Sequence, residues 1–423
     1  MSLIVAKFGG TSVATTDRIK SVAERLVKMK DEGNQVVAVV SAMGKTTDDL
    51  VAMADALNPN PPAREVDRLL STGEQVSMTL LAMAIEAMGV HAMSFSGRQA
   101  GIKTDGHHEK AKIVSVDNER IMECINNDGI AVVAGFQGID KNGDMTTLGR
   151  GGSDTTAVAV AYGLGADECQ IYSDVVGVYT ADPRVCPHAH KLDEISYDDM
   201  LELSAAGSGV LQMRAVEFAR KYKVVIHSRS AFSDEPGTLV KEETMEKSVI
   251  TGIAHDTSEV KVTVRGVPDV TGIAGRLFGA LSTRSVSVDM IIQGTSADGL
   301  ADISFTCPSK DLPKARKALE DLTDLGHTGV TVNENIAKVS LVGTGMKSSP
   351  GVAAKAFATL ADNDISILAI STSPIRLSVV VDGDQCAKAV QCLHTAFGMD
   401  VEEVFEEKAL SAEEIAAKMN KGR

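Results

Sequence analysis

Two glycine-rich segments of this chain combine residue types suited to holding phosphate or carboxylate groups. The first, KFGGTS at residues 7–12, follows a short apolar run; its glycines let backbone N–H groups approach phosphate oxygens, and Lys7 adds positive charge. The second, TLGRGGSDTT at residues 147–156, places three glycines around Arg150, which can hold a carboxylate through two parallel hydrogen bonds. A helix that begins near Ser153 would also favour an anion. An ordinary turn and a simple helix cap are the alternative interpretations of the two segments.

A third segment, SDVVGVYTADPR at residues 173–184, offers an aromatic ring, carboxylates and an arginine directly after a predicted strand. Open α/β sheets bind ligands at such strand ends, although a polar connecting loop would have a similar composition. Glu74 follows Ser71-Thr72-Gly73 at a predicted helix start, where a glutamate usually serves the helix dipole. Gly207-Ser208-Gly209 lacks the third glycine of a dinucleotide-binding fingerprint, so it carries no functional prediction.

These segments lie in a pattern of alternating strands and helices over about the first 240 residues. Apolar, β-branched runs predict strands at Leu3–Phe8, Gln35–Ser41, Ile130–Phe136 and Glu168–Asp174. Helices are predicted after Thr16, from Glu74 to Met88 and from Ser153 to Tyr162. This alternation predicts an α/β fold with an open, mainly parallel sheet covered by helices. The glycine-rich segments would converge at the rim of that sheet.

The rest of the chain contains an internal repeat. The segment that starts at Val260 resembles the segment that starts at Ala337, with Gly272 aligned to Gly351. Each copy predicts a small βαββαβ unit. A charged stretch at residues 241–248 marks the boundary with the first part of the chain. We therefore predict three domains, at residues 1–245, 260–335 and 336–410.

Composition narrows the classes of partner and compartment. The chain has 42 Lys and Arg against 57 Asp and Glu, a net charge of −15, and no basic run, which argues against a nucleic-acid partner. The start of the chain does not resemble a signal peptide, and no apolar stretch is long enough for a membrane helix. The six cysteines are scattered without a CxxC pair, so we expect reduced thiols, a cytoplasmic protein and no metal site built by the protein.

As a set, KFGGTS, VVSAMG (residues 39–44), STGE (residues 71–74), TTLGRGGSD and SDVVGVYTADPR resemble the motifs of bacterial aspartokinases of the amino-acid kinase superfamily. The repeat is similar to the tandem ACT domains of these enzymes. The resemblance implies an αβα-sandwich kinase core around an eight-stranded, mainly parallel sheet, followed by two ferredoxin-like ACT domains. It implies ATP-dependent, Mg²⁺-assisted phosphorylation of the β-carboxylate of L-aspartate, the first step toward lysine, threonine and methionine, under amino-acid feedback.

The resemblance also implies roles for individual residues. Lys7, Arg150 and Asp154 would be catalytic, with Asp154 organising Lys7 and the substrate. Arg150 would hold the α-carboxylate of aspartate, and Glu74 would face its ammonium group. The full set implied for aspartate is Ser41, Thr47, Glu74, Arg150, Gly151, Gly152 and Ser153. The set implied for ATP is Lys7, Phe8, Gly9, Gly10, Ser41, Ser173, Asp174, Tyr179, Thr180, Ala181, Asp182, Pro183 and Arg184.

The chain departs from the family pattern at both kinds of site. Val176 stands where the family has an aspartate, and Gly209 where it has a lysine, a charge that Lys223 would have to supply. Effector binding is implied for Asp269, Ser287, Val288, Gln293, Ala353, Ser366 and Ile367. Ser287 and Ser366 replace an asparagine, and serine has fewer donors and less reach. We therefore expect weakened feedback by lysine or threonine, or a different effector.

Two further expectations concern assembly and the competing functions. ACT units commonly pair edge to edge, so we expect a homo-oligomer whether or not these units bind an effector. The chain could instead be another carboxylate kinase of the superfamily, which leaves the ACT repeat unexplained. It could also be a degenerate kinase that senses an amino acid, which Val176 and Gly209 favour. The intact set of Lys7, Glu74, Arg150 and Asp154 argues against that second alternative.

Overall fold

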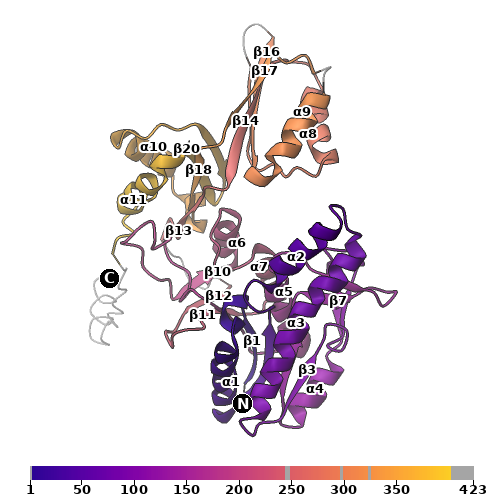
Figure 1. Cartoon of the computed structure of the whole chain (residues 1–423). Coiled ribbons are helices and arrows are strands. Elements are labelled where there is room, and N and C mark those ends of the chain that lie inside the picture. The colour runs from indigo at the N-terminus through magenta and orange to yellow at the C-terminus, as the bar shows by residue number, and fades with distance from the viewer. Residues whose placement is uncertain (1, 243–247, 296–298, 323–324, 402–423) are drawn as a thin grey trace, which may run out of the picture.

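The computed structural model describes residues 2–242, 248–295, 299–322 and 325–401, which form an N-terminal α/β part and two smaller C-terminal units (Figure 1). The N-terminal part is built on an eight-stranded sheet with the strand order β10-β12-β11-β9-β1-β2-β6-β3. Its strands are β1 (Leu3–Phe8), β2 (Gln35–Val40), β3 (Ala92–Phe95), β6 (Ile130–Ala134), β9 (Glu168–Ser173), β10 (Glu194–Ser196), β11 (Ile226–Ser230) and β12 (Thr238–Lys241). All neighbours are parallel except β11 and β12, which confirms the predicted mainly parallel sheet.

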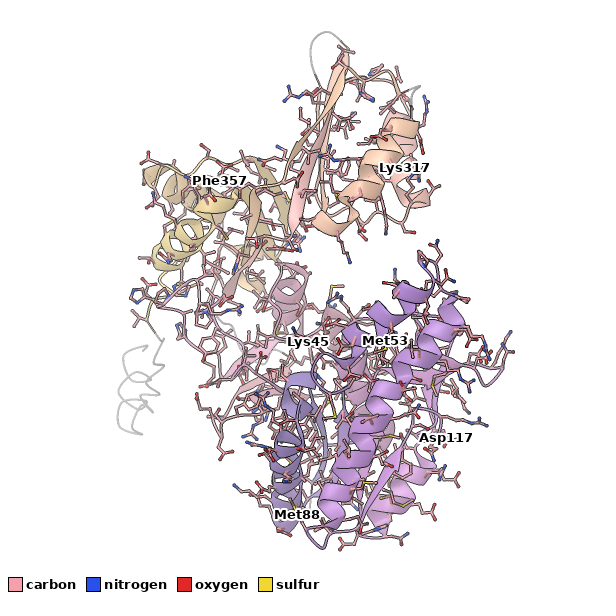
Figure 2. All side chains as sticks on the ribbon, viewed as in Figure 1. Lys45, Met53, Met88, Asp117, Lys317 and Phe357 are labelled. Carbon is pink, nitrogen blue, oxygen red and sulfur yellow. The ribbon has the colours of Figure 1, made fainter. Side chains whose placement is uncertain are left out.

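Helices cover both faces of this sheet, as an αβα sandwich requires. One face packs against α1 (Thr16–Asp31) and α3 (Ala63–Glu86). The other packs against α4 (Glu119–Asn126), α5 (Gly152–Leu164), α6 (Tyr197–Ala205) and α7 (Met213–Tyr222). Helix α2 (Thr46–Leu57) lies outside these layers and buries none of its residues. Lys45 at its start and Met53 on its outer surface are labelled in Figure 2.

The central strand β1 contributes side chains to both layers, because successive residues of a strand point to opposite faces. Val5 belongs to the core that includes α5, whereas Ala6 and Phe8 belong to the core that includes α1 and α3. Lys7 lies two residues after Val5, so its side chain faces α5. This alternation decides which helix can supply a counter-charge to Lys7.

The helix that contains Glu74 is longer than predicted. The sequence pattern predicts a start at Glu74, but α3 begins at Ala63, so that prediction is wrong. Ser71-Thr72-Gly73 has the composition of a turn and nevertheless lies in the helix interior. Gly73 permits close packing there, because a Cβ atom at this position would lie 2.8 Å from the Cβ of Ala42. The helix-dipole role considered for Glu74 therefore does not apply.

A second, four-stranded sheet in the N-terminal part leads into the Arg150 segment. It contains β4 (Ile102–Thr104), β5 (Ile113–Val116), β7 (Gln137–Ile139) and β8 (Met145–Thr147), in the order β5-β4-β7-β8. Strand β8 ends three residues before Arg150, and α5 begins two residues after it. The segment that carries Arg150 is thus a short connection between a strand and a helix.

The two C-terminal units each contain a four-stranded antiparallel sheet and two helices, as the repeat predicts. The first consists of β14 (Glu259–Pro268), α8 (Ile273–Thr283), β15 (Ile291–Thr295), β16 (Leu300–Pro308), α9 (Leu312–Asp321) and β17 (Gly329–Asn333). The second contains β18 (Ile336–Val342), α10 (Val352–Asp362), β19 (Ala369–Ser373), β20 (Arg376–Asp382) and α11 (Cys386–Ala396).

The fourth strand of the second unit comes from an unexpected part of the chain. Strand β13 (Gly252–Asp256) precedes the first unit in sequence, yet it pairs with β18 at the edge of the second sheet. The predicted boundaries of 336–410 omit this strand, and residues 402–410 lie outside the described part of the chain. Because β13 follows β12 closely, it also places the second unit directly against the N-terminal part.

Two further observations concern membrane helices and cysteines. None of the helices in the described ranges combines the length and the apolar character that a membrane crossing requires. All six cysteines are free thiols, five of them buried and Cys392 partly exposed, as the scattered spacing predicts.

Candidate active site

The loops after β1, β2, β6 and β9 meet at one edge of the sheet and are hydrogen-bonded to one another. The N–H of Gly9 donates to the carbonyl of Tyr172 at 3.2 Å, and the N–H of Ser41 donates to the carbonyl of Phe8 at 3.1 Å. The N–H of Gly44 donates to the carbonyl of Gly10 at 3.0 Å. Below them, the rings of Phe8 and Tyr172 stack with centroids 4.7 Å apart. Parallel strands with neighbouring carboxyl ends thus bring together the predicted segments 7–12, 39–44 and 173–184.

Lys7 and Asp154 form an ion pair at the centre of this edge. The Nζ atom of Lys7 lies 2.6 Å from Oδ1 of Asp154, and both side chains are about nine-tenths buried. Asp154 belongs to the first turn of α5, the helix that covers the face to which Lys7 points. A buried ion pair is costly to form, so its position beside the Gly9–Gly10 loop indicates a functional rather than a stabilising role. The two residues predicted to act together are therefore in contact.

Glu74 projects from the interior of α3 toward the loop after β2. Its side chain is 3% exposed, and Oε1 accepts a hydrogen bond from the N–H of Ala42 at 3.1 Å. The other carboxylate oxygen, Oε2, is buried and has no hydrogen-bond partner among the described residues. Burial raises the pKa of Glu74 to about 7. A buried carboxylate with a free oxygen is suited to receive a cationic group of a ligand.

The Glu74 carboxylate and the Gly9–Gly10 loop belong to one continuous site, because Ala42 contacts both. The N–H of Ala42 donates to Glu74, and its carbonyl lies 2.9 Å from where a Cβ of Gly10 would be. Ser41, the preceding residue, is half-buried, and its carbonyl accepts from Ser77 at 2.7 Å. Thr47 is half-buried in the first turn of α2, beyond the same loop.

Arg150 lies exposed on a connection that a half-buried arginine and a buried aspartate hold in place. Arg214 of α7 donates to the carbonyls of Leu148 at 2.6 Å and Ala111 at 2.7 Å. Asp67 of α3, which is fully buried, accepts from the hydroxyl of Thr147 at 2.5 Å. The sequence patterns did not indicate Asp67 or Arg214, because their partners lie at least 41 positions away. Because Asp67 and Arg214 hold this connection in place, the side chain of Arg150 is free to contact a ligand.

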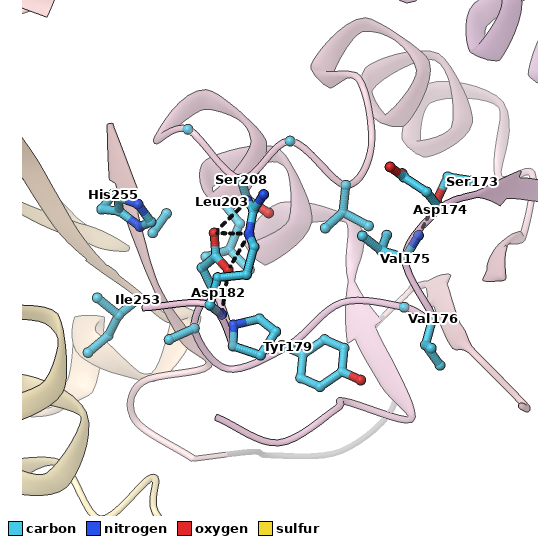
Figure 3. A pocket seen from close by; sticks show the side chains of 18 residues that line it. Ser173, Asp174, Val175, Val176, Tyr179, Asp182, Leu203, Ser208, Ile253 and His255 are labelled. Carbon is cyan, nitrogen blue, oxygen red and sulfur yellow. Dashed lines mark hydrogen bonds and ion pairs between the residues drawn. The ribbon is translucent and has the colours of Figure 1, made fainter. Parts of the chain in front are cut away.

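A pocket of about 580 Å³ lies beyond the carboxyl end of β9 (Figure 3). It is lined by residues 173–177, 179, 181–184, 203, 207–210 and 253–255. The predicted residues of the segment 173–184 all line it except Thr180. Both departures from the family pattern, Val176 and Gly209, line it as well, whereas Lys223 does not. Lys223 instead pairs with Glu242 at 2.8 Å, so it is not placed to replace the missing lysine.

The pocket contains little positive charge. Of the described residues that line it, Arg184 is the sole arginine or lysine, and its guanidinium pairs with Asp182 at 2.7 Å. Hydrogen bonds from Arg184 lower the pKa of Asp182. The rim further carries the exposed carboxylate of Asp174. This lining suits the uncharged parts of a nucleotide better than its phosphates, for which the Lys7 loop is the cationic alternative.

Part of the pocket wall comes from the second C-terminal unit, which the sequence patterns did not indicate. Ile253, Ala254 and His255 belong to β13, the edge strand of the second sheet. Gly207 lies against this strand with a φ of +113°, and a Cβ there would lie 2.5 Å from the carbonyl oxygen of His255. Gly207 is therefore a close-packed joint between the two parts of the wall.

We expect Gly207→Ala to lower the free energy of unfolding by about 2–4 kcal/mol, because the left-handed backbone and the contact with His255 both oppose a side chain. Gly209→Ala is the matched control, since no atom lies within 4 Å of its added Cβ, and it should change stability by less than about 0.5 kcal/mol. Urea unfolding measures both variants. Equal stability of the two would show that the joint is not close-packed.

The residues implied in effector binding all lie on the two C-terminal units. Asp269, Ser287 and Gln293 are exposed on the first unit, and Val288 is half-buried beside them. Ala353 and Ser366 are exposed on the second unit, and Ile367 is half-buried. Effector binding by these residues remains a prediction.

Comparison with known proteins gives the family. The amino acid kinase family model matches residues 2–228, and the ACT domain model matches residues 260–322 and 339–397. An aspartokinase of Mycolicibacterium smegmatis is 51% identical over 407 residues, which cover 94% of this chain and 97% of that relative. An aspartokinase of Corynebacterium efficiens is 49% identical over 411 residues, covering 95% and 98% of the two chains. The structure of E. coli aspartokinase III in complex with aspartate and ADP has a TM-score of 0.76 and 26% identity, covering 93% of this chain and 99% of that one. This chain, with its kinase core and its two ACT units, belongs to the aspartokinases.

Proposed function

We propose that this chain transfers the γ-phosphoryl group of ATP to the β-carboxylate of L-aspartate at the carboxyl edge of its eight-stranded sheet. The observation that carries this assignment is the buried Lys7–Asp154 pair, which lies at the same edge of the sheet as the loop that holds the unpaired carboxylate of Glu74. The E. coli relative was solved with aspartate and ADP, the substrate and the product that this reaction involves. No sensor function is needed to explain the site.

Aspartate is assigned to the side of the edge formed by α3, α5 and the Arg150 connection. The exposed guanidinium of Arg150 would hold the α-carboxylate through two parallel hydrogen bonds. Glu74 would accept the ammonium group through its free Oε2 atom. Further contacts are assigned to Ser41, Thr47, Gly151, Gly152 and Ser153. These assignments leave the β-carboxylate as the group that faces Lys7.

ATP is assigned to the pocket beside β9 and to the neighbouring Gly9–Gly10 loop. The pocket would take the base and ribose, because Arg184, the arginine in its wall, is already neutralised by its ion pair with Asp182. The phosphates would extend over Phe8, Gly9 and Gly10 toward Lys7, where backbone N–H groups and an ammonium group can stabilise them. The nucleotide tail would then meet the aspartate β-carboxylate beside Lys7.

The proposed chemistry needs charge neutralisation rather than a strong base. The β-carboxylate is ionised at neutral pH, so it can attack phosphorus without losing a proton. Lys7 would stabilise the charge that spreads over the transferring phosphoryl group, and Asp154 would hold its ammonium group in place. The exposed carboxylate of Asp174 would be available to hold a Mg²⁺ ion that is bound with the phosphates. When bound, Mg²⁺ supplies further neutralisation of phosphate charge.

A hydroxamate assay tests this function directly. With MgATP and hydroxylamine, we expect product from aspartate and none above background from glutamate or N-acetylglutamate, as for the aspartokinases that this chain resembles. The three substrates are compared at equal concentration in the same preparation. Product from glutamate but not aspartate would contradict the assignment of the substrate.

Regulation and assembly are assigned to the ACT units. A second structure of the E. coli relative contains lysine with aspartate in the T state. We propose that this chain responds to lysine, threonine or both, and that the serines at 287 and 366 weaken the response. Adding lysine and threonine, singly and together, to the hydroxamate assay tests this, and sub-millimolar concerted inhibition would contradict the proposed weakening of the response. A homo-oligomer formed through the ACT units is proposed as well, and the free cysteines support a cytoplasmic setting.

A further inference from the structure

A fully buried histidine connects the second ACT unit to residues 173–184, called here the nucleotide segment because ATP is assigned to the pocket that they line. His394 of α11 is 0% exposed, and both of its ring nitrogens have partners. Its Nδ1 atom lies 2.7 Å from Oδ1 of Asp400, and its Nε2 atom lies 2.9 Å from Oγ1 of Thr180. Asp400 belongs to the same unit, whereas Thr180 belongs to the segment 173–184, more than 200 positions earlier. This contact therefore joins two domains by one side chain.

The neighbouring hydrogen bonds indicate which atom is the donor in the bond between Thr180 and His394. The hydroxyl of Thr180 accepts from the N–H of His190 at 3.1 Å, which leaves its own hydrogen for donation to Nε2 of His394. Nδ1–H of His394 then donates to the carboxylate of Asp400, so the neutral Nδ1–H tautomer is assigned. Turning either His394 or Thr180 away would leave a buried polar group without a partner. The polar atoms of the His394 and Thr180 side chains thus all have hydrogen-bond partners only in this one arrangement.

The backbone of Thr180 is held by the same unit. Its carbonyl accepts from the N–H of Ile253 in β13 at 2.7 Å. One residue beyond the segment 173–184, Gln391 of α11 donates to the carbonyl of Val185 at 2.7 Å. Two elements of the second ACT unit, β13 and α11, therefore hold the nucleotide segment from one side.

Thr180 does not line the pocket, but the residues beside it do. Tyr179 precedes it and Ala181 follows it, and both belong to the pocket wall, as does Ile253 (Figure 3). The geometry of a pocket wall depends on where its backbone is held. A side chain that anchors Thr180 thus acts on nucleotide binding without touching the nucleotide.

We propose that His394 is a positioning residue for ATP, which holds Tyr179 and Ala181 in their binding arrangement through Thr180. Packing of the second ACT unit then sets the affinity for nucleotide directly. Aspartate binding is spared, because Glu74 lies on α3 and Arg150 on the connection between β8 and α5. This inference rests on the proposed assignment of the nucleotide to the pocket beside β9.

Steady-state kinetics and calorimetry with ADP test the proposal on the full-length protein. Thr180→Val removes one hydroxyl while keeping the shape of the side chain, and His394→Ala removes the anchor. We expect each to raise the KM for ATP and the Kd for ADP about tenfold, with the KM for aspartate changed by less than about twofold. His394→Gln retains a polar group near the Nε2 position and should recover part of the affinity. The double variant should be little worse than His394→Ala alone, because both changes break the same contact.

Ser378→Ala is the matched control. Ser378 forms a buried hydrogen bond with Ser340 at 2.8 Å inside the second ACT sheet, without contact to the nucleotide segment. An equal loss of ADP affinity in Ser378→Ala would indicate general loosening of the unit and overturn the proposal. Unchanged affinity in Thr180→Val would overturn it too, and this variant decides the matter if His394→Ala does not fold. A parent protein that binds ADP but forms no product from aspartate would contradict the proposed function and leave this inference intact.

Discussion

Lys7→Ala is expected to lower the turnover number about a thousandfold, with the KM for aspartate changed by less than about threefold. The ammonium group of Lys7 is held by Asp154 beside the Gly9–Gly10 loop, where the transferring phosphoryl group is assigned. Its charge is needed most when negative charge spreads over the phosphoryl oxygens, so its loss acts on the transition state rather than on aspartate binding. Steady-state kinetics over a range of aspartate concentrations at saturating MgATP separate the two parameters.

The Lys7 prediction needs controls for stability, because Lys7→Ala leaves the buried carboxylate of Asp154 without its partner. Such a change destabilises a protein by about 3–5 kcal/mol. The double variant Lys7→Met with Asp154→Asn removes both charges together and should unfold at a higher urea concentration than Lys7→Ala, with turnover equally low. Lys20→Ala, a change at an exposed lysine of α1, should behave as the parent. Parental turnover in a folded Lys7 variant would remove Lys7 from the mechanism.

Glu74→Gln is expected to raise the KM for aspartate about 30- to 100-fold, because it removes a charge-assisted hydrogen bond to the ammonium group. Glutamine retains an oxygen that can accept from the N–H of Ala42, so the local structure should persist. Turnover at saturating aspartate should fall much less. Glu65→Gln changes an exposed glutamate of the same helix and serves as the control, for which parental kinetics are expected.

The pKa of Glu74 makes the same substitution informative about stability. Without ligand, the folded protein binds this proton up to about pH 7, whereas the unfolded chain releases it near the ordinary value of 4.5. The free energy of unfolding of the parent therefore falls as pH rises through this window. At pH 8, Glu74→Gln should be more stable than the parent by about 3 kcal/mol, and the difference should vanish below about pH 4.5. Urea unfolding at both pH values measures it.

The affinity for aspartate should rise with pH, whereas the free energy of unfolding falls. The ionised form of Glu74 is the form proposed to bind the ammonium group, so the KM for aspartate in the parent should fall as pH rises through about 7. Glu74→Gln should lack this change. A parent whose KM for aspartate is constant between pH 6 and 8 would place the ammonium group elsewhere.

Local patterns in the sequence were sufficient for the family and for most of the proposed site. Short segments such as 7–12, 147–156 and 173–184 combine a turn, a strand or helix end and charged side chains within a dozen residues. Because parallel strands place their carboxyl ends along one edge, predicting the sheet also predicted that the segments 7–12 and 173–184 meet. The repeat likewise predicted the two ACT sheets from the spacing of apolar residues and glycines.

Only the tertiary structure decided the features that depend on distant contacts and on burial. Glu74 changes from a helix-start residue to a buried carboxylate because Gly73 packs against Ala42, a contact that no local pattern contains. Strand β13 completes a sheet whose other strands begin some eighty residues later, and it also forms part of the wall of the pocket beside β9. The bond between His394 and Thr180 spans more than 200 positions. Side-chain type and spacing determine what chemistry a segment can perform, whereas burial, charge compensation and the joining of domains arise from packing.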